Sequence, residues 1–475
     1  MKGIELTPAL HPTIFVIFGI TGDLAGRKLL PALLGLYAKK MLPSRFAVIG
    51  FSRRTFNREE FRELIRSRLN IQPGQFKEED VKHFLDHISY EQGMFDNANA
   101  YEQLANKLKK IDAEWGQCSN KLFHLSVPPN LYQGILNRLA QSKLTIPCAD
   151  QSGWTRILIE KPFGNNIEIA RALDKLLGSL FKEKQIFRID HYLAKEALQN
   201  IVAFRFTNSI FEPLWCRKYI EKIHIKLFER EGVEGRGAFY DSLGALKDVG
   251  QNHLLQMLSL VTMERPLSFV GDDIRYERAR VLARLSKMKF RTIDKMFVKG
   301  QYRGYSSENG VSRDSQTETY IRVKTSIRNA RWKNVPIYLE SGKSMGETKT
   351  AIDIYFKNNP PAGGAADGGK SGQNILTFRI QPNEGIKIKF FVKVPGYEWK
   401  SEPRTLKFNY NDNPSLSLIV LNDYERLIHD AFAGDQTLFA STDEIMASWR
   451  FVTSILENWG KLPLVIYEKG AREVG

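Results

Sequence analysis

Two different patterns of hydrophobic and polar positions divide the chain. Up to about residue 188, short apolar segments alternate with segments of helical pattern. Buried strands are predicted at 13–18, 46–51, 121–127 and 156–159, and a helix over 24–41 with an interruption at Pro31. Strands that alternate with helices are typical of βαβ units and a parallel sheet.

The second part of the chain follows a period of two. Apolar and lysine positions alternate from Ile386 to Val394, and shorter alternations occur at 223–227 and 352–356. Such strands have one solvated face, which is typical of an antiparallel sheet. Helices are predicted over 245–263 and 443–459, and the Gly-rich segment Asn358 to Asn374 is expected to be a flexible hairpin loop.

Length and composition indicate a globular protein of two domains. The chain has 475 residues, of which 43% are hydrophobic and 26% charged. The apolar run Ile14 to Phe18 is far shorter than the roughly 20 residues that cross a bilayer, and the first residues lack the pattern of a secretion signal. We therefore expect no membrane association and a cytoplasmic location.

The three cysteines support the same location. Cys118, Cys148 and Cys216 are widely spaced and contain no CxxC pair. This pattern argues against a disulfide scaffold or a zinc site, and for a reducing compartment.

The net charge of +16 favours an anionic ligand. The basic residues are dispersed, without a run of five or six, so nucleic acid is the less favoured partner. A phosphorylated substrate together with a phosphate-rich cofactor explains the positive charge as well as nucleic acid does.

A glycine-containing turn follows the first predicted strand. The segment GITGDLA, from Gly19 to Ala25, leads directly into a helix. Glycines permit a tight turn and close approach of a pyrophosphate, and a helix N-terminus offers free N–H groups to it. The spacing is G-x-x-G-x-x-A rather than G-x-G-x-x-G, so an ordinary βα turn is the alternative.

The end of the second strand carries two arginines. NAD-preferring folds usually place Asp or Glu there, whereas this chain has Arg53 and Arg54. Guanidinium groups match the oxygens of a 2′-phosphate, which favours NADP, with NAD as the weaker alternative. Two solvated loop arginines are the other interpretation.

Three further segments carry chemistry. Lys161, in EKPFG, follows an apolar strand, where side chains face the ligand crevice of an open sheet. If Asp190 caps a helix, His191 and Lys195 lie four residues apart on one face and suit a phosphate group. The alternative for Lys161 is an ordinary surface lysine. The alternative for the second segment is that Asp190 only caps a helix and that the side chains after it are solvated.

His253 lies in or beside the apolar stripe of the predicted helix over 245–263. Oxidation of a sugar hydroxyl needs a base, and an imidazole has a suitable pKa. A carboxylate on its other ring nitrogen would stabilise the imidazolium. The alternative is a histidine whose role is only to fill the core.

Taken together, these motifs resemble those of the glucose-6-phosphate dehydrogenase family over nearly the whole chain. The matching segments are GxxGDLA at 19–25, EKPFG at 160–164, RIDHYLxKE at 188–196, EGRG at 234–237, DVxQNHLLQ at 248–256, GQY at 300–302, VPIYLESGK at 335–343, QPNE at 381–384 and YERLI at 424–428. So many motifs in order are very specific.

The resemblance implies a function and a fold. The reaction would be oxidation of D-glucose 6-phosphate to 6-phospho-D-glucono-1,5-lactone with hydride transfer to NADP, the first step of the oxidative pentose phosphate pathway, without a metal. The fold would be an α/β Rossmann-type dinucleotide-binding domain over residues 1–188, followed over 189–475 by an α+β domain with a large, mainly antiparallel sheet. That sheet would form a homodimer, or a dimer of dimers.

The resemblance also implies roles for individual residues. His253 would be the base and Asp190 its partner, and the phosphate would be bound by His191, Tyr192 and Lys195. Sugar contacts would come from Lys161, Glu229, Asp248, Lys343 and Gln381. The cofactor would be bound by Gly19, Thr21, Gly22, Asp23, Leu24, Ala25, Lys28, Arg53 and Lys161.

The chain departs from the family pattern at three places. Ala194 stands where the family usually has Gly, and its methyl group could crowd the sugar. Thr348, followed by Lys349, stands where a second basic residue is common, and the Gly-rich segment resembles an insertion.

Two other functions are compatible with parts of the pattern. One is a related sugar or polyol dehydrogenase, because an EKP segment also occurs in other Rossmann-type sugar oxidoreductases. The other is a basic nucleic-acid-binding or scaffold protein without activity, which would be retained on DNA in a salt-dependent way.

Overall fold

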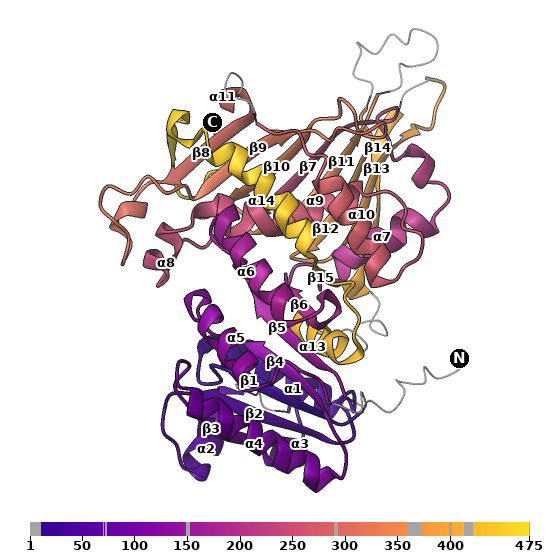
Figure 1. The fold of residues 1–475 in the computed structure, drawn as a ribbon. Coiled ribbons are helices and arrows are strands. Elements are labelled where there is room, and N and C mark those ends of the chain that lie inside the picture. Colours follow the sequence, from indigo (N-terminus) through magenta and orange to yellow (C-terminus); the bar gives the residue numbers. More distant parts are fainter. Residues whose placement is uncertain are drawn as a thin grey trace. The chain divides into compact units, whose positions relative to one another are not determined.

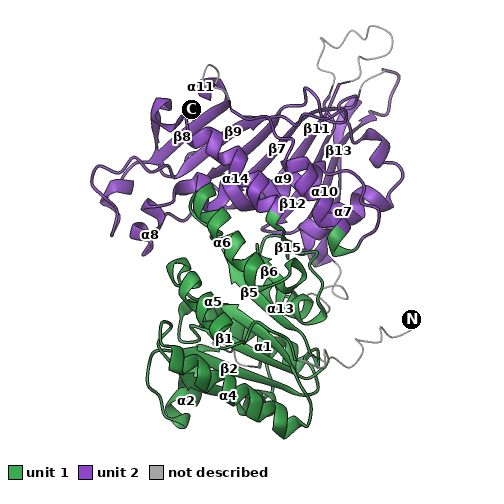
Figure 2. Cartoon of the chain, in the orientation of Figure 1, with its two compact units in different colours: residues 1–194, 270–272, 421–442 green, residues 195–269, 273–420, 443–475 purple. Residues whose placement is uncertain are grey.

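The computed structural model describes residues 11–69, 71, 74–148, 153–288, 293–358, 372–398, 401–412 and 421–474 (Figure 1). The chain divides into two compact units, coloured separately in Figure 2. The first comprises residues 1–194, 270–272 and 421–442, and the second comprises residues 195–269, 273–420 and 443–475.

The first unit is built on a seven-stranded sheet with the order β15-β6-β5-β4-β1-β2-β3. All its neighbouring strands pair in parallel except β15 with β6. All six side chains of β1 are buried, because helices cover both faces of a parallel sheet. The strands are β1 (Thr13–Phe18), β2 (Phe46–Ser52), β3 (Ile88–Gln92), β4 (Asn120–Leu125), β5 (Thr155–Glu160), β6 (Ile186–Ile189) and β15 (Phe439–Ala440).

The helix after β1 differs from the expected one. Pro31 does not interrupt it, because a π-helical turn precedes an α-helix in whose first turn Pro31 lies, where its missing N–H costs nothing. The helices of this unit are η1 (Ala25–Leu29), α1 (Leu30–Ala38), α2 (Arg58–Arg68), α3 (Glu78–Asp86), α4 (Ala98–Trp115), η2 (Pro129–Leu131), α5 (Tyr132–Gln141), α6 (Ile167–Leu180), η3 (Glu183–Gln185) and α13 (Asp423–Ala433).

A late segment of the chain returns to the first unit. Helix α13 packs on α1, where Lys39 Nζ lies 2.6 Å from the buried carboxylate of Glu425. The short strand β15 then extends the sheet beside β6. The motif YERLI, at residues 424–428 of α13, therefore belongs to the first unit.

The second unit contains a nine-stranded sheet with the order β14-β13-β12-β11-β7-β10-β9-β8-β16. Its pairs are antiparallel except β7 with β10 and β8 with β16, as the sequence predicted for a mainly antiparallel sheet. The strands are β7 (Ile220–Phe228), β8 (Phe297–Tyr302), β9 (Tyr320–Thr325), β10 (Ile337–Gly342), β11 (Lys349–Phe356), β12 (Ile375–Gln381), β13 (Gly385–Lys393), β14 (Ser401–Asn409) and β16 (Leu464–Tyr467).

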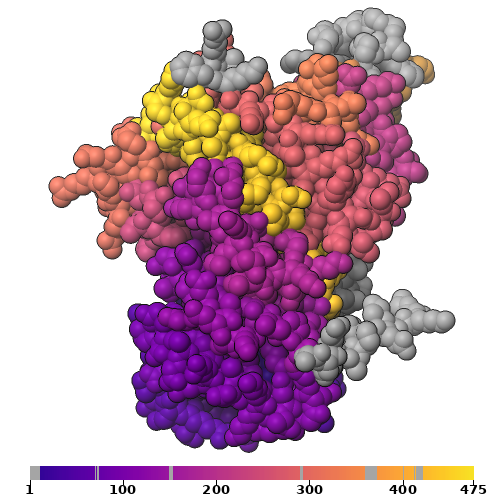
Figure 3. Space-filling model, viewed as in Figure 1, coloured from indigo at the N-terminus to yellow at the C-terminus, as the bar shows by residue number. Residues whose placement is uncertain are grey.

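Helices of the second unit include the two long segments predicted from the sequence. Residues 443–474, at the yellow end of the colour bar, form part of the surface of this unit (Figure 3). Among the described residues, no helix is both long and apolar enough to cross a bilayer. The helices are α7 (Glu196–Thr207), η4 (Glu212–Leu214), α8 (Gly237–Asp241), η5 (Leu246–Leu254), α9 (Leu255–Thr262), α10 (Gly271–Leu282), α11 (Ile293–Met296), η6 (Tyr305–Ser307), η7 (Tyr410–Asp412), α14 (Thr442–Leu456) and η8 (Trp459–Lys461).

Most of the expected Gly-rich loop, residues 359–371, lies outside the described residues. The strands that it joins, β11 and β12, are antiparallel neighbours.

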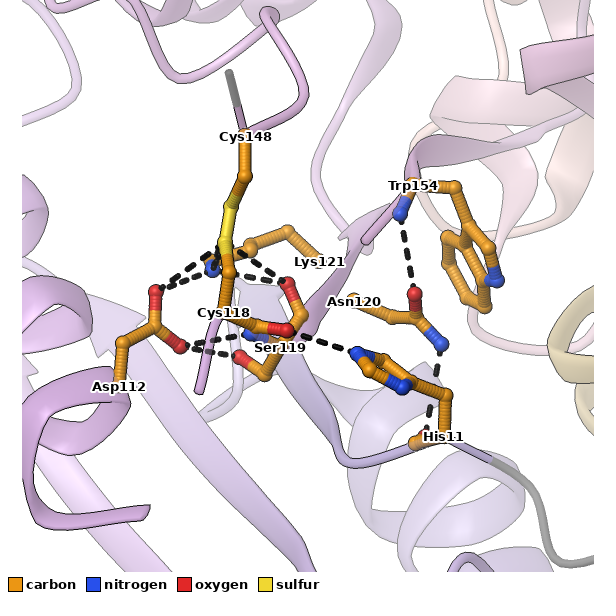
Figure 4. Close-up of a disulfide and its surroundings, with 8 residues drawn as sticks. All are labelled: His11, Asp112, Cys118, Ser119, Asn120, Lys121, Cys148 and Trp154. Carbon is orange, nitrogen blue, oxygen red and sulfur yellow. Dashed lines mark hydrogen bonds and ion pairs between the residues drawn. A yellow bond between two sulfur atoms is a disulfide. The ribbon is translucent and has the colours of Figure 1, made fainter. Parts of the chain in front are cut away.

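Two cysteines are joined, although the cysteine pattern argued against disulfides and for a reducing compartment. Cys118 and Cys148 form a disulfide with a Cα–Cα distance of 6.4 Å (Figure 4). The Nζ atom of Lys121 lies beside both sulfur atoms and forms an ion pair with Asp112 at 2.5 Å. The sequence argument was wrong for this pair, because residues 30 positions apart are brought together by tertiary folding rather than by a local motif.

Candidate active site

The turn after β1 brings the backbone very close to the end of β4. Gly19 has a φ of +79°, and a Cβ at this position would lie 2.3 Å from the carbonyl oxygen of Ser126. The N–H of Gly22 donates to the carbonyl of Gly19 at 2.8 Å and closes the turn. Position 19 therefore requires glycine for both its φ and its lack of a side chain.

A cavity of about 630 Å³ opens beside this turn. It lies where β1, β2 and β4 end, and β1 and β4 are the neighbours at which the strand order reverses. Open α/β sheets bind their ligands at this place. Four of the predicted cofactor residues line the cavity, namely Gly19, Thr21, Gly22 and Arg53.

The described lining of the cavity does not include the other predicted cofactor residues. Exposed Asp23 instead pairs with Arg27, whose Nε lies 2.8 Å from its carboxylate. Ala25 is buried inside η1, and Lys28 is exposed on the same helix. The remaining two residues outside the described lining are Leu24 and Lys161.

Both arginines after β2 are available to an anion. Arg53 and Arg54 line the cavity with exposed side chains, and neither forms an ion pair within the part of the chain that the structure describes. An exposed guanidinium pair at the mouth of a cavity is a suitable receptor for a phosphate group.

Several lining residues were not predicted from the sequence. They come from the segments that follow β3 and β4, and they include Met94, Phe95, Asp96, Ser126, Val127, Pro128 and Asn130. For the residues after β4, the signal that could have found them is the predicted strand at 121–127, because parallel strands end at one edge of the sheet. For those after β3 there was no such signal, since no strand was predicted at 88–92.

The end of β5 is firmly held by neighbouring side chains. The carboxylate of Glu160 accepts a hydrogen bond from the Tyr424 hydroxyl at 3.1 Å, and His124 Nε2 lies 3.3 Å from it. The Tyr132 hydroxyl donates to the Glu160 carbonyl at 3.1 Å. Lys161, the next residue, is therefore attached to a fixed strand end and is half-buried.

Asp190 does not cap a helix, which was the condition for placing His191 and Lys195 on one face; a turn follows it instead. Asp190 Oδ1 accepts a hydrogen bond from the N–H of Tyr192 at 3.1 Å, and helix α7 begins only at Glu196, with Lys195 as its N-cap. His191 and Lys195 thus do not share a helical face. The physical reason is that the Asp side chain stabilises a local turn in competition with the helix.

Glu229 and Lys343 meet although they are 114 residues apart in sequence. Each directly follows a strand, and these strands, β7 and β10, are parallel neighbours that end in register. The ammonium group of Lys343 forms an ion pair with Glu229 and lies 5.3 Å from the ring centre of Tyr240. Lys343 is only 5% exposed, so the charge is held in place for a polar ligand.

Asp248 and His253 lie on helix η5, which is π-helical over its whole length. A π-helix bonds residue i to i+5, so two residues five apart lie nearly above one another, unlike in an α-helix. His253 is buried and Asp248 is half-buried. Such turns are frequent at functional sites, and no sequence periodicity indicated this one.

Gln381 ends β12 at the same edge of the sheet. It lies opposite Thr350 of β11, and Thr350 in turn lies opposite Leu227 of β7. Thr348 is engaged locally, because its hydroxyl accepts a hydrogen bond from the N–H of Arg230 at 3.2 Å. In the second unit, three predicted sugar residues therefore lie where neighbouring strands end, namely Glu229, Lys343 and Gln381. The fourth, Asp248, lies on helix η5.

Two family models together match almost the whole chain. The model described as the NAD binding domain of glucose-6-phosphate dehydrogenase matches residues 16–200. The model of the C-terminal domain of glucose-6-phosphate dehydrogenase matches residues 202–474.

Individual relatives agree with these models. Glucose-6-phosphate 1-dehydrogenase of Borreliella burgdorferi is 40% identical over 96% of this chain and 94% of the relative. The enzyme of that name from Chlamydia pneumoniae is 39% identical over 96% of this chain and 91% of the relative. A solved structure of glucose-6-phosphate dehydrogenase in complex with glucose 6-phosphate has a TM-score of 0.89 and 33% identity, over 98% of this chain and 96% of the other.

Proposed function

Because this chain belongs to the glucose-6-phosphate dehydrogenase family, we propose how its residues divide the work of the reaction. The reaction is the oxidation of D-glucose 6-phosphate to 6-phospho-D-glucono-1,5-lactone, the first step of the oxidative pentose phosphate pathway. Bound NADP supplies the nicotinamide that accepts the hydride. The observation that carries the proposal is the glycine turn beside a cavity edged by Arg53 and Arg54.

The residues of the first unit fit a dinucleotide. A Cβ at Gly19 would meet the carbonyl oxygen of Ser126, so glycine lets the turn close against the end of β4. The turn leads into a helix N-terminus, whose free N–H groups suit a pyrophosphate. Arg53 and Arg54 offer charge for a 2′-phosphate, whereas an Asp or Glu would repel it. We assign cofactor binding to Gly19, Thr21, Gly22, Asp23, Leu24, Ala25, Lys28, Arg53 and Lys161.

We assign His253 as the base that takes the proton of the C1 hydroxyl group. Its location on a π-helix and its burial support this role, since a base shielded from water works without competing hydration. Asp190, which is also buried, is assigned as the carboxylate that stabilises the imidazolium.

We assign the phosphate of the substrate to His191, Tyr192 and Lys195, which offer a ring N–H, a hydroxyl and an ammonium group. The hydroxyl groups of the sugar are assigned to Lys161, Glu229, Asp248, Lys343 and Gln381. The support for the pair Glu229 and Lys343 is its burial at the strand ends, where donors and acceptors have fixed directions.

The division of labour extends to the assembly. We propose that residues 1–188 bind the cofactor and contribute Lys161 to the sugar site, while residues 189–475 provide the other sugar contacts and form a homodimer or a dimer of dimers. The exposed apolar side chains of Leu406 and Phe408 on β14 support self-association. A cytoplasmic location, where both substrates are available, completes the proposal.

A steady-state assay with two cofactors and two sugars tests the function. NADP with glucose 6-phosphate should give the highest kcat/KM, measured as NADPH absorbance. Equal kcat/KM for unphosphorylated glucose would indicate a related sugar dehydrogenase. Absence of turnover together with salt-dependent retention on DNA would indicate a nucleic-acid-binding protein.

A further inference from the structure

Strand β3 carries two side chains that reach the turn bearing the two arginines. β3 lies beside β2 in the sheet and pairs with it in parallel (Figure 1). Tyr90 lies opposite Gly50, and Gln92 lies opposite Ser52. Residues two apart on a strand face the same side of the sheet. From that side, Tyr90 and Gln92 both contact the polypeptide just beyond the end of β2.

The hydroxyl group of Tyr90 is surrounded by oxygen atoms of this turn. It lies 2.9 Å from both the carbonyl oxygen and the Oγ atom of Ser52, and it donates to the carbonyl of Arg54. Burial raises the pKa of Tyr90, so the phenol keeps its proton in the physiological range and remains a donor. Ser52 Oγ also accepts from Thr21 Oγ1 at 3.4 Å, which links the glycine turn to the arginine turn.

Gln92 contacts two other residues of the same turn, Arg53 and Thr55. Its Nε2 donates to Thr55 Oγ1 at 2.9 Å and, at the limit of a hydrogen bond, to the carbonyl of Arg53 at 3.5 Å. The carbonyl groups of both arginines are therefore held by β3. Fixing these carbonyls restricts the backbone from which each long side chain extends, and so reduces the entropy that is lost when the guanidinium groups bind.

The ring and the hydroxyl of Tyr90 have separable roles. The ring packs against Phe56 and Phe61, with centroid distances of 5.4 and 4.6 Å. This packing accounts for an aromatic residue at position 90 but does not require a hydroxyl. A phenylalanine would keep the packing and lose only the hydrogen bonds to Ser52 and Arg54.

We propose that Tyr90 and Gln92 are positioning residues for cofactor selection, and that they hold Arg53 and Arg54 in place for the 2′-phosphate of NADP. The proposal rests on the proposed cofactor role of the arginines. Neither residue contacts the reacting atoms in this proposal, and neither lines the described cavity.

The test uses the full-length enzyme with Tyr90→Phe and, separately, Gln92→Leu. The kcat/KM for NADP should fall about three- to tenfold in each variant, as expected for one hydrogen bond, through KM rather than kcat. The values for NAD should change less than twofold, because NAD lacks the 2′-phosphate. Inhibition by adenosine 2′,5′-bisphosphate should weaken by the same factor, whereas inhibition by 5′-AMP should not.

Tyr37→Phe is the matched control, because Tyr37 packs against the rings of Phe46, Phe84 and His87 in the same unit. Among the described residues, no hydrogen bond joins its side chain to the arginine turn. An equal loss for NADP and NAD in both test variants, or no loss in either, would overturn the proposal. Arg53→Ala tests the cofactor role of Arg53 separately from the positioning role of Tyr90 and Gln92. It should lower the NADP preference by more than tenfold, and an unchanged preference would refute the assignment of Arg53 itself.

Discussion

Burial of single side chains changes their pKa values and so determines which of them are charged in this enzyme. Tyr240 is buried, and burial, followed by the nearby carboxylate of Asp248, raises the pKa of its hydroxyl well above the ordinary value. The phenol therefore remains neutral. It can donate a hydrogen bond beside the charged pair of Lys343 and Glu229 without adding a third charge to the site.

Replacing the assigned base should slow the chemical step. For His253→Asn we expect kcat to fall by roughly 10²–10⁴-fold with little change in KM, since asparagine cannot accept the proton. Steady-state kinetics with NADP and glucose 6-phosphate measure this change. His83→Asn, on the exposed side of α3, is the control, and near-normal turnover of the His253 variant would remove this residue from the mechanism.

Replacing a phosphate ligand should affect one substrate selectively. Lys195→Ala or His191→Asn should raise KM for glucose 6-phosphate by about tenfold or more, because a charge-assisted hydrogen bond is lost. KM for free glucose should hardly change. Lys184→Ala, at an exposed lysine, is the control, and equal effects on both sugars would contradict the phosphate assignment.

At the scale of elements, helix η5 depends on a buried acid from another segment. Glu318 Oε1 accepts a hydrogen bond from the N–H of Leu246 at 2.9 Å, and the Glu318 carbonyl accepts one from Ala245 at 3.0 Å. The start of the helix that carries Asp248 and His253 is thus capped by the segment that precedes β9. Burial raises the pKa of Glu318 to about 7.

This pKa predicts a pH-dependent stability. The folded-state pKa lies above the ordinary value of 4.5. The contribution of protonated Glu318 to the free energy of unfolding is therefore fully present below about pH 4.5, and it is lost as the pH rises through 7. Compared with Glu318→Gln, the wild-type protein should lose up to about 3 kcal/mol of unfolding free energy between pH 4.5 and 8, at about 1.36 kcal/mol per pKa unit.

Urea unfolding at pH 5 and pH 8 measures this difference. Glu347→Gln, at an exposed carboxylate, should keep the pH dependence of the wild type. Parallel pH dependences for wild type and Glu318→Gln would contradict the predicted titration.

At the scale of the whole molecule, the first unit is completed by residues that come more than 200 positions after its last strand of the parallel series. The attachment of α13 to α1 depends on Gly35, where a Cβ would lie 1.8 Å from a carboxylate oxygen of Glu425. That carboxylate also binds Lys39 and closes the capping box of α13.

Gly35→Ala should therefore destabilise the protein by about 1–3 kcal/mol, although alanine is the better helix former. The cost arises because Glu425 must give up its partners. Gly178→Ala in α6, where nothing lies within 4 Å, should instead be neutral or stabilising. Thermal unfolding compares the two variants, and equal midpoints would show that α13 is not held through this contact.

Local patterns of the sequence determined the elements and much of the chemistry. Apolar runs predicted the buried parallel strands, and alternation predicted the second sheet, because each pattern follows from which faces of a strand lose water. The glycine turn and the two arginines were recognisable because φ restrictions and charge are properties of single residues.

Only the tertiary structure decided which distant residues meet. It paired Glu229 with Lys343, joined Cys118 to Cys148 and returned residues 421–442 to the first unit. It also gave His191 a turn rather than the helix that a cap at Asp190 would have started, and it gave η5 its π-helical register. These outcomes depend on strand order and on competing hydrogen bonds between segments, and no periodicity within one segment encodes either.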